Sequence, residues 1–133
     1  MSFTTCLLVT IGGAIGSLAR YALSVAALPI SQSLPWGTIG INILGSFVIG
    51  LFGTLTLANG RFPVSEEARI LVMVGMCGGF TTFSSFSLQT LNLMNDGEWL
   101  YATGNIAGSV ILCMLFVWLG AISATALNQL KGT

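Results

Sequence analysis

Charge is the scarcest property of this 133-residue chain, which has four Lys or Arg, four Asp or Glu and no histidine. Charged residues make up 6% of the chain, against ~25% in soluble domains, and 54% of its residues are hydrophobic. A soluble fold with so little charge would lack the polar surface that keeps it dissolved. Without histidine or paired thiols, a metal site of such ligands is not expected, and we interpret Cys6, Cys77 and Cys113 as small buried apolar residues.

The few charges leave four long uncharged stretches. They run from Phe3 to Ala19, Tyr21 to Gly60, Ile70 to Asn95 and Trp99 to Leu130. A helix needs about 20 mostly apolar residues to cross the hydrocarbon core, and prolines divide the second stretch. We therefore predict an all-α integral membrane protein, with one transmembrane domain over residues 1–133. Its four predicted helices cover residues 3–28, 36–58, 66–94 and 99–127.

The acidic residues all flank the ends of predicted helices, at positions 66, 67, 96 and 98. Ser65, followed by Glu66 and Glu67, has the pattern of a helix start, where a hydroxyl caps the first turn and the dipole favours carboxylates. A proton-coupled exporter usually keeps a carboxylate inside the membrane as its relay. The lack of one here argues against a proton-driven four-helix drug exporter.

Two features bear on the leader and the orientation of the chain. Ser24–Ala27 resembles a signal cleavage site, but no basic region precedes it and Arg20 interrupts the apolar stretch, so cleavage is not expected. The N-terminus, the loop between helices two and three and the C-terminus are predicted to share one side. That side holds Arg61, Arg69 and Lys131, which mildly favours a cytoplasmic N-terminus by the positive-inside rule.

Polar and small residues recur every four positions on two of the predicted helices. They are Thr38, Asn42, Ser46, Gly50 and Thr54 on the second helix, and Tyr101, Asn105, Ser109 and Cys113 on the fourth. Residues four apart share a helix face, and one such stripe would suit helix packing in lipid. Two neutral stripes, each with a mid-membrane asparagine, favour a lined pathway. Neutral donors suit a small ion that must not bind too tightly.

Glycine pairs four residues apart occur three times, at positions 12 and 16, 75 and 79, and 104 and 108. Small residues at this spacing let helix backbones approach closely in a membrane. We expect close backbone packing at the first and the last of these pairs.

The segment Gly75–Ser87, with the sequence GMCGGFTTFSSFS, lies near the centre of the third predicted helix. Adjacent glycines followed by hydroxyl residues form helix poorly, so we predict a break there. A break frees carbonyls that lipid cannot satisfy, and such breaks line a cavity or coordinate an ion. An unbroken helix with a small-residue packing face is the alternative. Phe83 and Phe86 share a face, and the positive edges of their rings could replace part of an anion's hydration.

Three segments resemble, in order and spacing, the signatures of the Fluc/CrcB family of fluoride channels. They are Gly12–Arg20 (GGAIGSLAR), Pro35–Asn42 (PWGTIGIN) and Gly78–Ser87 (GGFTTFSSFS), of which the last is highly specific. The resemblance covers nearly the whole chain. It implies an antiparallel, dual-topology homodimer with two fluoride pores and a sodium ion at its centre.

The resemblance also implies roles for individual residues. Backbone carbonyls of Gly78 and Thr81 from each subunit would hold the structural sodium, and Arg20 matches an arginine near the end of the first helix. The residues that would line the fluoride pore are Asn42, Phe83, Phe86, Thr38, Ser84, Ser85, Tyr101, Asn105 and Ser109. Gln89 departs from the pattern, because other members often have glutamate there.

The function implied is passive, fluoride-selective export from the cytoplasm across the cell inner membrane, which relieves fluoride toxicity; the chain is not expected to be an enzyme. Hydrogen fluoride enters cells uncharged and dissociates inside, so a negative-inside membrane drives the trapped anion out without ATP. Fluoride, a second copy of the chain and membrane lipids are the expected partners, and no nucleic acid is expected. The alternatives are a small-molecule exporter of the dual-topology four-helix class and a non-transporting membrane scaffold.

Overall fold

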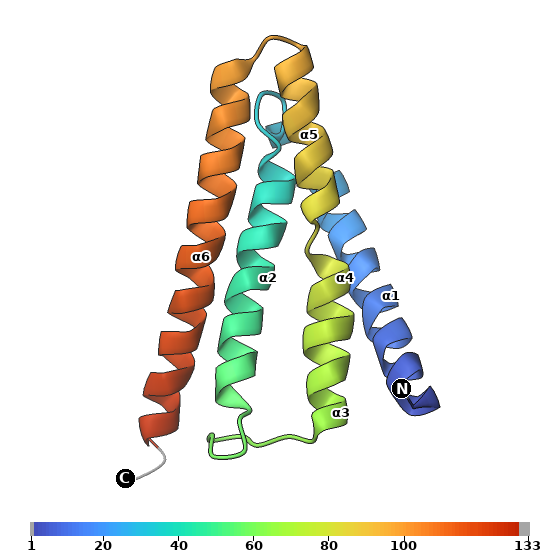
Figure 1. The fold of residues 1–133 in the computed structure, drawn as a ribbon, viewed down its shortest axis with the longest axis vertical. Coiled ribbons are helices and arrows are strands. Elements are labelled where there is room, and N and C mark those ends of the chain that lie inside the picture. Colours follow the sequence, from blue (N-terminus) through green and yellow to red (C-terminus); the bar gives the residue numbers. More distant parts are fainter. Residues whose placement is uncertain (1, 131–133) are drawn as a thin grey trace.

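The computed structural model describes residues 2–130, which fold into helices joined by short connections (Figure 1). The α-helices are α1 (Phe3–Ala26), α2 (Trp36–Leu55), α3 (Glu66–Arg69), α4 (Gly78–Phe80), α5 (Phe83–Asn95) and α6 (Trp99–Gln129). A 3₁₀ turn, η1 (Leu28–Ile30), follows α1, and a π-helical segment, η2 (Ile70–Cys77), joins α3 to α4.

Four spans of the described chain are long and apolar enough to cross a membrane, which confirms the predicted all-α membrane fold. They are Phe3–Ala26, Trp36–Leu55, Glu66–Asn95 and Trp99–Gln129, so α3, η2, α4 and α5 together form the third span. The π-helical stretch was not expected, because its run of apolar residues fits an α-helix of the same length equally well.

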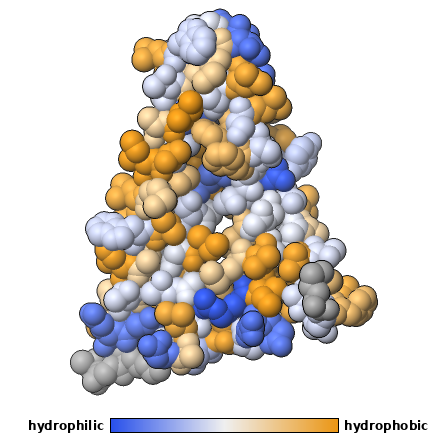
Figure 2. Space-filling view, in the orientation of Figure 1, coloured by the Kyte–Doolittle hydropathy of each residue, from blue (hydrophilic) through white to orange (hydrophobic). Residues whose placement is uncertain are grey.

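The spans converge near the α5–α6 turn and spread apart toward the opposite end (Figure 1). The described chain begins and ends at that wider end, where the α2–α3 loop also lies, as predicted; Lys131 lies outside the described residues. On the face shown in Figure 2, hydrophilic residues gather at the two ends and hydrophobic residues cover much of the height between them. This distribution matches a chain that spans a bilayer.

Local sequence signals explain where the helices begin and end. Ser65 accepts a hydrogen bond from the Ala68 N–H at 3.2 Å and starts the third span, as predicted. The first helix ends at Ala26, two residues before the predicted end, and Leu28 and Pro29 continue the chain in the 3₁₀ turn η1. Gly97, with a φ of 78°, adopts the left-handed conformation that the short turn into α6 requires.

Two arginines at the wider end bind the carboxyl ends of helices. Arg69 Nη1 donates to the Gly53 carbonyl at 3.0 Å and to Thr56 Oγ1 at 2.6 Å, at the end of α2. Arg61 Nη1 donates to the Leu127 carbonyl at 3.4 Å, near the end of α6. Since helix carboxyl ends carry partial negative charge, both cations stabilise the ends of these spans.

Glycine contacts fix α1 against the third span. A Cβ on Gly12 would lie 2.9 Å from the Cα of Gly75, and a Cβ on Gly16 would lie 2.9 Å from the Phe80 nitrogen. The predicted close packing of the first glycine pair is therefore confirmed. The packing expected at Gly104 and Gly108 is not made within the described chain, because a Cβ there would meet no heavy atom within 4 Å.

Candidate functional site

The third span is interrupted at Thr81 and Thr82, between α4 and α5. Both residues have extended backbone, with φ −77° and ψ 155° at Thr81 and φ −149° and ψ 112° at Thr82. The predicted break is confirmed, although Gly78 and Gly79 are helical, so that it begins after them. Thr82 Oγ1 accepts from the Ser85 N–H at 3.2 Å, which starts α5 with a side-chain cap.

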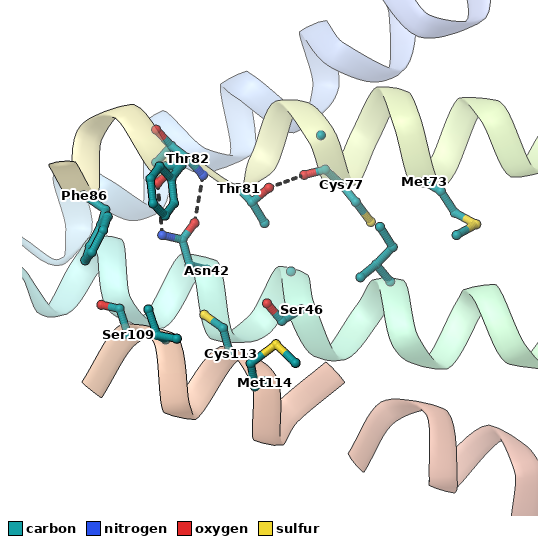
Figure 3. Close-up of a pocket in the computed structure, with 15 residues that line it drawn as sticks. Asn42, Ser46, Met73, Cys77, Thr81, Thr82, Phe86, Ser109, Cys113 and Met114 are labelled. Atoms are coloured by element: carbon teal, nitrogen blue, oxygen red, sulfur yellow. Dashed lines mark hydrogen bonds between the residues drawn. The ribbon is translucent and has the colours of Figure 1, made fainter. Parts of the chain in front are cut away.

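Asn42 of α2 holds the break through both halves of its amide (Figure 3). The Thr82 N–H donates to Asn42 Oδ1 at 2.8 Å, and Asn42 Nδ2 donates to the Thr82 carbonyl at 3.1 Å. A primary amide is neutral and offers both a donor and an acceptor, so it satisfies both backbone groups of one extended residue. The NH₂ group also carries a second N–H.

At the break, two backbone N–H groups bind side chains instead of backbone carbonyls. In a continuous α-helix, the Gly78 carbonyl would accept from the Thr82 N–H and the Thr81 carbonyl from the Ser85 N–H. The Thr82 N–H goes to Asn42 instead, and the Ser85 N–H goes to Thr82 Oγ1. The carbonyls of Gly78 and Thr81 are therefore two of the carbonyls that lose their helical donors at the break, in their case to side chains.

Arg20 of α1 reaches the broken span from another side. Its Nε donates to the Gly79 carbonyl at 3.1 Å, and Ser17 Oγ donates to the same oxygen at 3.4 Å. An arginine side chain stays protonated at any physiological pH. The contact therefore places a permanent positive charge beside the end of α4 while tying α1 to it.

A cavity of about 400 Å³ lies between the third span, α2 and α6, and we call it the phenylalanine cavity. It brings together members of both predicted polar stripes with the two aromatic rings (Figure 3). These lining residues are Asn42 and Ser46 from α2, Phe83 and Phe86 from α5, and Ser109 and Cys113 from α6. Its described lining contains no carboxylate, lysine or arginine.

Phe83 and Phe86 contact each other at the phenylalanine cavity, as their spacing predicts. Their ring centroids are 5.0 Å apart and the rings are tilted by 48°. Phe86 is 8% exposed, whereas Phe83 is 75% exposed in the single chain. The pair therefore joins a buried ring to one at the open surface.

A second cavity, of about 340 Å³, lies on the other side of the break, and we call it the arginine cavity. Its polar lining includes Arg20, Thr38, Ser85, Gln89 and the carboxylate of Asp96. Gln89 Oε1 is buried and has no hydrogen-bond partner among the described residues. Thr82 is the one described residue that lines both cavities, so the break separates them.

Some residues of the predicted pore lie away from both cavities. Ser84 is exposed, and its hydroxyl lies 3.4 Å from Thr82 Oγ1. Tyr101 is 40% exposed, Asn105 is fully buried, and both are absent from the described linings of the two cavities. Thr90, whose hydroxyl accepts a hydrogen bond from Asn105, was not among the predicted site residues. The only sequence signal for Thr90 is its position four residues after Phe86 on α5.

These features define a small multi-pass membrane protein whose third span is broken between two polar-lined cavities. The chain belongs to the CrcB family, because residues 7–121 match the family described as CrcB-like protein, Camphor Resistance (CrcB). The resemblance inferred from the three sequence segments is thus confirmed.

Curated relatives match nearly the whole chain. One from Methylobacterium radiotolerans is 66% identical over 128 residues, which cover 96% of this chain and 90% of the relative. One from Gluconobacter oxydans is 65% identical over 129 residues, with coverage of 96% and 90%. One from Opitutus terrae is 54% identical over 128 residues, with coverage of 96% and 97%. Each of the three is named fluoride-specific ion channel FluC.

Proposed function

We propose that this chain is the subunit of a fluoride-selective channel through which fluoride passes down its electrochemical gradient. The observation that carries the proposal is the Thr82 junction, which Asn42 binds between a cavity lined by the Arg20 guanidinium and a cavity with neutral lining. The name shared by the relatives supports the choice of ion.

The chemistry of the two cavities suits a small, strongly hydrated anion. Arg20 attracts an anion to the arginine cavity without lining the phenylalanine cavity. Beyond the break, the second N–H of Asn42, the Ser109 hydroxyl and the ring edges offer partial positive charge in place of water. Because none of them is a full charge, the ion can leave as well as enter.

An antiparallel, dual-topology homodimer is part of the proposal. The phenylalanine cavity is open in the single chain, and Phe83 at its edge is 75% exposed. The empty space at Gly104 and Gly108 would also accept a close backbone contact from a second copy. Few charges oppose either orientation of the chain, since the described residues hold only Arg20, Arg61 and Arg69 as cations.

A structural sodium ion at the centre of this dimer is also proposed. The backbone carbonyls of Gly78 and Thr81 fit a hard cation, because their helical donors are bound to side chains. When bound, the ion would offset the repulsion between carbonyls that face one another. The described residues contain no group of three or more His, Cys, Asp or Glu that could hold a metal.

The proposed physiological role is export of cytoplasmic fluoride across the cell inner membrane, which relieves fluoride toxicity. Dissociation of hydrogen fluoride inside the cell traps the anion there. The membrane potential, negative inside, then drives fluoride outward through an open pathway without ATP.

Reconstitution in liposomes tests the proposed transport. Liposomes loaded with potassium fluoride and treated with a potassium ionophore should release fluoride without any pH gradient, whereas liposomes loaded with chloride should retain it. Release that requires an imposed proton gradient would indicate an exporter. A folded protein that releases neither anion would indicate a scaffold.

Orientation is tested separately with a reporter at the C-terminus, measured on both faces of the cell membrane. Labelling from both faces is expected for the dual-topology dimer. Labelling from one face only would contradict the antiparallel assembly but leave the transport proposal standing.

A further inference from the structure

A chain of hydrogen bonds leads from the phenylalanine cavity into the interface between α5 and α6. Ser109 Oγ donates to Asn105 Oδ1 at 3.3 Å, Asn105 Nδ2 donates to Thr90 Oγ1 at 2.8 Å, and Thr90 Oγ1 donates to the Phe86 carbonyl at 2.8 Å. Both ends, Ser109 and Phe86, line the cavity. The two middle members are buried, with Thr90 6% and Asn105 0% exposed.

The direction of this chain is set from the Phe86 end. A carbonyl oxygen can only accept, so the Thr90 hydroxyl donates its hydrogen to the Phe86 carbonyl and presents its lone pairs to Asn105. The amide must then present its NH₂ group to Thr90 and its oxygen to Ser109. That oxygen in turn draws the Ser109 proton toward the helix interface and away from the cavity.

The link nearest the cavity is the longest of the three. Hydroxyl donors usually lie about 2.7–2.8 Å from an oxygen acceptor, so the Ser109 bond at 3.3 Å is weak. The two bonds of Thr90 are both 2.8 Å and lie out of reach of water. An anion in the cavity can therefore accept a hydrogen bond from the Ser109 hydroxyl in place of Asn105, while the two hydrogen bonds of Thr90 stay in place.

We propose that Thr90 is a positioning residue for ion passage, because its hydroxyl fixes the orientation of the Asn105 amide and thereby restrains the proton of Ser109. The inference rests on the proposed channel function. Thr90 is absent from the described lining of the cavity, so it acts through Asn105. When Thr90 loses its hydroxyl, the Asn105 amide is free to turn its NH₂ group toward Ser109. The Ser109 proton then points permanently into the cavity and holds the anion longer.

The test compares three variants with the unmodified dimer in planar bilayers. Thr90→Val removes the hydroxyl at nearly constant volume, and Thr90→Ser keeps it. Thr125→Val is the matched control, because Thr125 is an exposed residue of α6 whose hydroxyl donates to the Ala121 carbonyl at 2.9 Å, also four residues back. Single-channel current is measured against fluoride concentration, and the melting temperature of each variant is measured in detergent.

Thr90→Val is expected to lower both the half-saturating fluoride concentration and the maximal current, each by about fivefold, the scale of one hydrogen bond. Thr90→Ser and Thr125→Val should keep the unmodified half-saturation. In a Ser109→Ala background, Thr90→Val should no longer shift the half-saturation, because the residue through which it acts is gone. If Thr90→Val does not assemble, Thr90→Cys, with its weaker donor, should give a smaller shift in the same direction.

An unchanged half-saturating fluoride concentration in Thr90→Val would overturn the inference, as would an unchanged value in Thr90→Cys if Thr90→Val does not assemble. The inference would also be overturned if Thr90→Val shifted the half-saturation equally in the unmodified and the Ser109→Ala backgrounds. A maximal current that falls only in step with the melting temperature would show that Thr90 is a packing residue. If the unmodified protein conducts no fluoride, the proposed function fails first, and the inference falls with it.

Discussion

The arginine cavity and the phenylalanine cavity are of similar size, about 340 and 400 Å³, but they offer an anion different contacts. The first contains the guanidinium of Arg20, the carboxylate of Asp96 and several polar side chains. The second contains aromatic rings, sulfur atoms and neutral hydroxyls. The difference separates two tasks, because a full charge attracts an ion from water, whereas weak neutral contacts let it move on.

Asn42→Asp should have the largest effect, because it places a negative charge at the junction of the two cavities. Two like charges about 4 Å apart repel by about 4 kcal/mol at an effective dielectric constant of about 20, which corresponds to about a thousandfold less flux. Fluoride efflux from liposomes measures the loss. Asn59→Asp, the same change at an exposed loop position, is the control and should leave efflux unchanged. Full efflux from a folded, dimeric Asn42→Asp would show that the two cavities do not meet at this residue.

Removal of sodium should have the next largest effect. The proposed carbonyl ligands, on Gly78 and Thr81, belong to residues that line the phenylalanine cavity, so the ion would supply this cavity with the positive charge that it otherwise lacks. An ion present at 100 times its dissociation constant stabilises the folded state by about 2.7 kcal/mol. Exchange of sodium for N-methylglucamine should lower both the melting temperature and fluoride efflux. Identical melting and efflux in the two buffers would count against the site.

Phe83→Ile and Phe86→Ile should each lower fluoride efflux by about twofold to tenfold, since each removes a ring edge worth about 0.5–1.5 kcal/mol. Tyr or Met at either position, which keeps polarisable surface, should be milder. Phe3→Ile, at a residue 79% exposed on α1, is the control.

Burial separates a role in transport from a role in packing for these two rings. Phe86 is 8% exposed, so its replacement by Ile should cost about 1 kcal/mol of stability, whereas Phe83, 75% exposed in the single chain, should cost less than about 0.5 kcal/mol. Melting temperature and efflux are measured on the same samples. Efflux that falls only where stability falls would reduce both rings to packing residues.

Gln89→Glu should have the smallest effect, although it makes the same amide-to-carboxylate change as Asn42→Asp. Gln89 lines the arginine cavity, where the Arg20 guanidinium offsets a new negative charge even though Gln89 Oε1 is buried. A net repulsion of about 0.6 kcal/mol would remain, or about a threefold loss of fluoride efflux. Equal losses in the two variants would erase the distinction between the cavities.

The sequence predicts the spans well, because long uncharged stretches and helix-ending prolines are local signals. It predicts the break less accurately. Gly78 and Gly79 form helix poorly, yet they remain helical where Gly79 packs so closely on Gly13 that a Cβ would lie 2.6 Å from the Gly13 carbonyl oxygen. The Thr82 hydroxyl and the Asn42 amide decide where the helix stops, and the second of these is a contact between helices.

The polar stripe on α6 shows why spacing alone could not assign the pore. Positions four apart on an α-helix are rotated by about 40° from one another, so Tyr101 and Cys113 differ by about 120°. Ser109 and Cys113 therefore face the phenylalanine cavity, while Tyr101 and Asn105 point elsewhere. The pairing of Asn105 with Thr90 depends on the rotation of α5 relative to α6, which no local pattern contains.

The partners of the broken span have a consequence for biosynthesis. Asn42 belongs to the second span, and Ser17 and Arg20 belong to the first, so all three precede Thr82 in the order of synthesis. A growing chain therefore has these side chains in place before the exposed backbone of the third span enters the bilayer. The backbone groups of Thr82 and the Gly79 carbonyl therefore find their partners in earlier spans and do not depend on the last span for shielding from lipid.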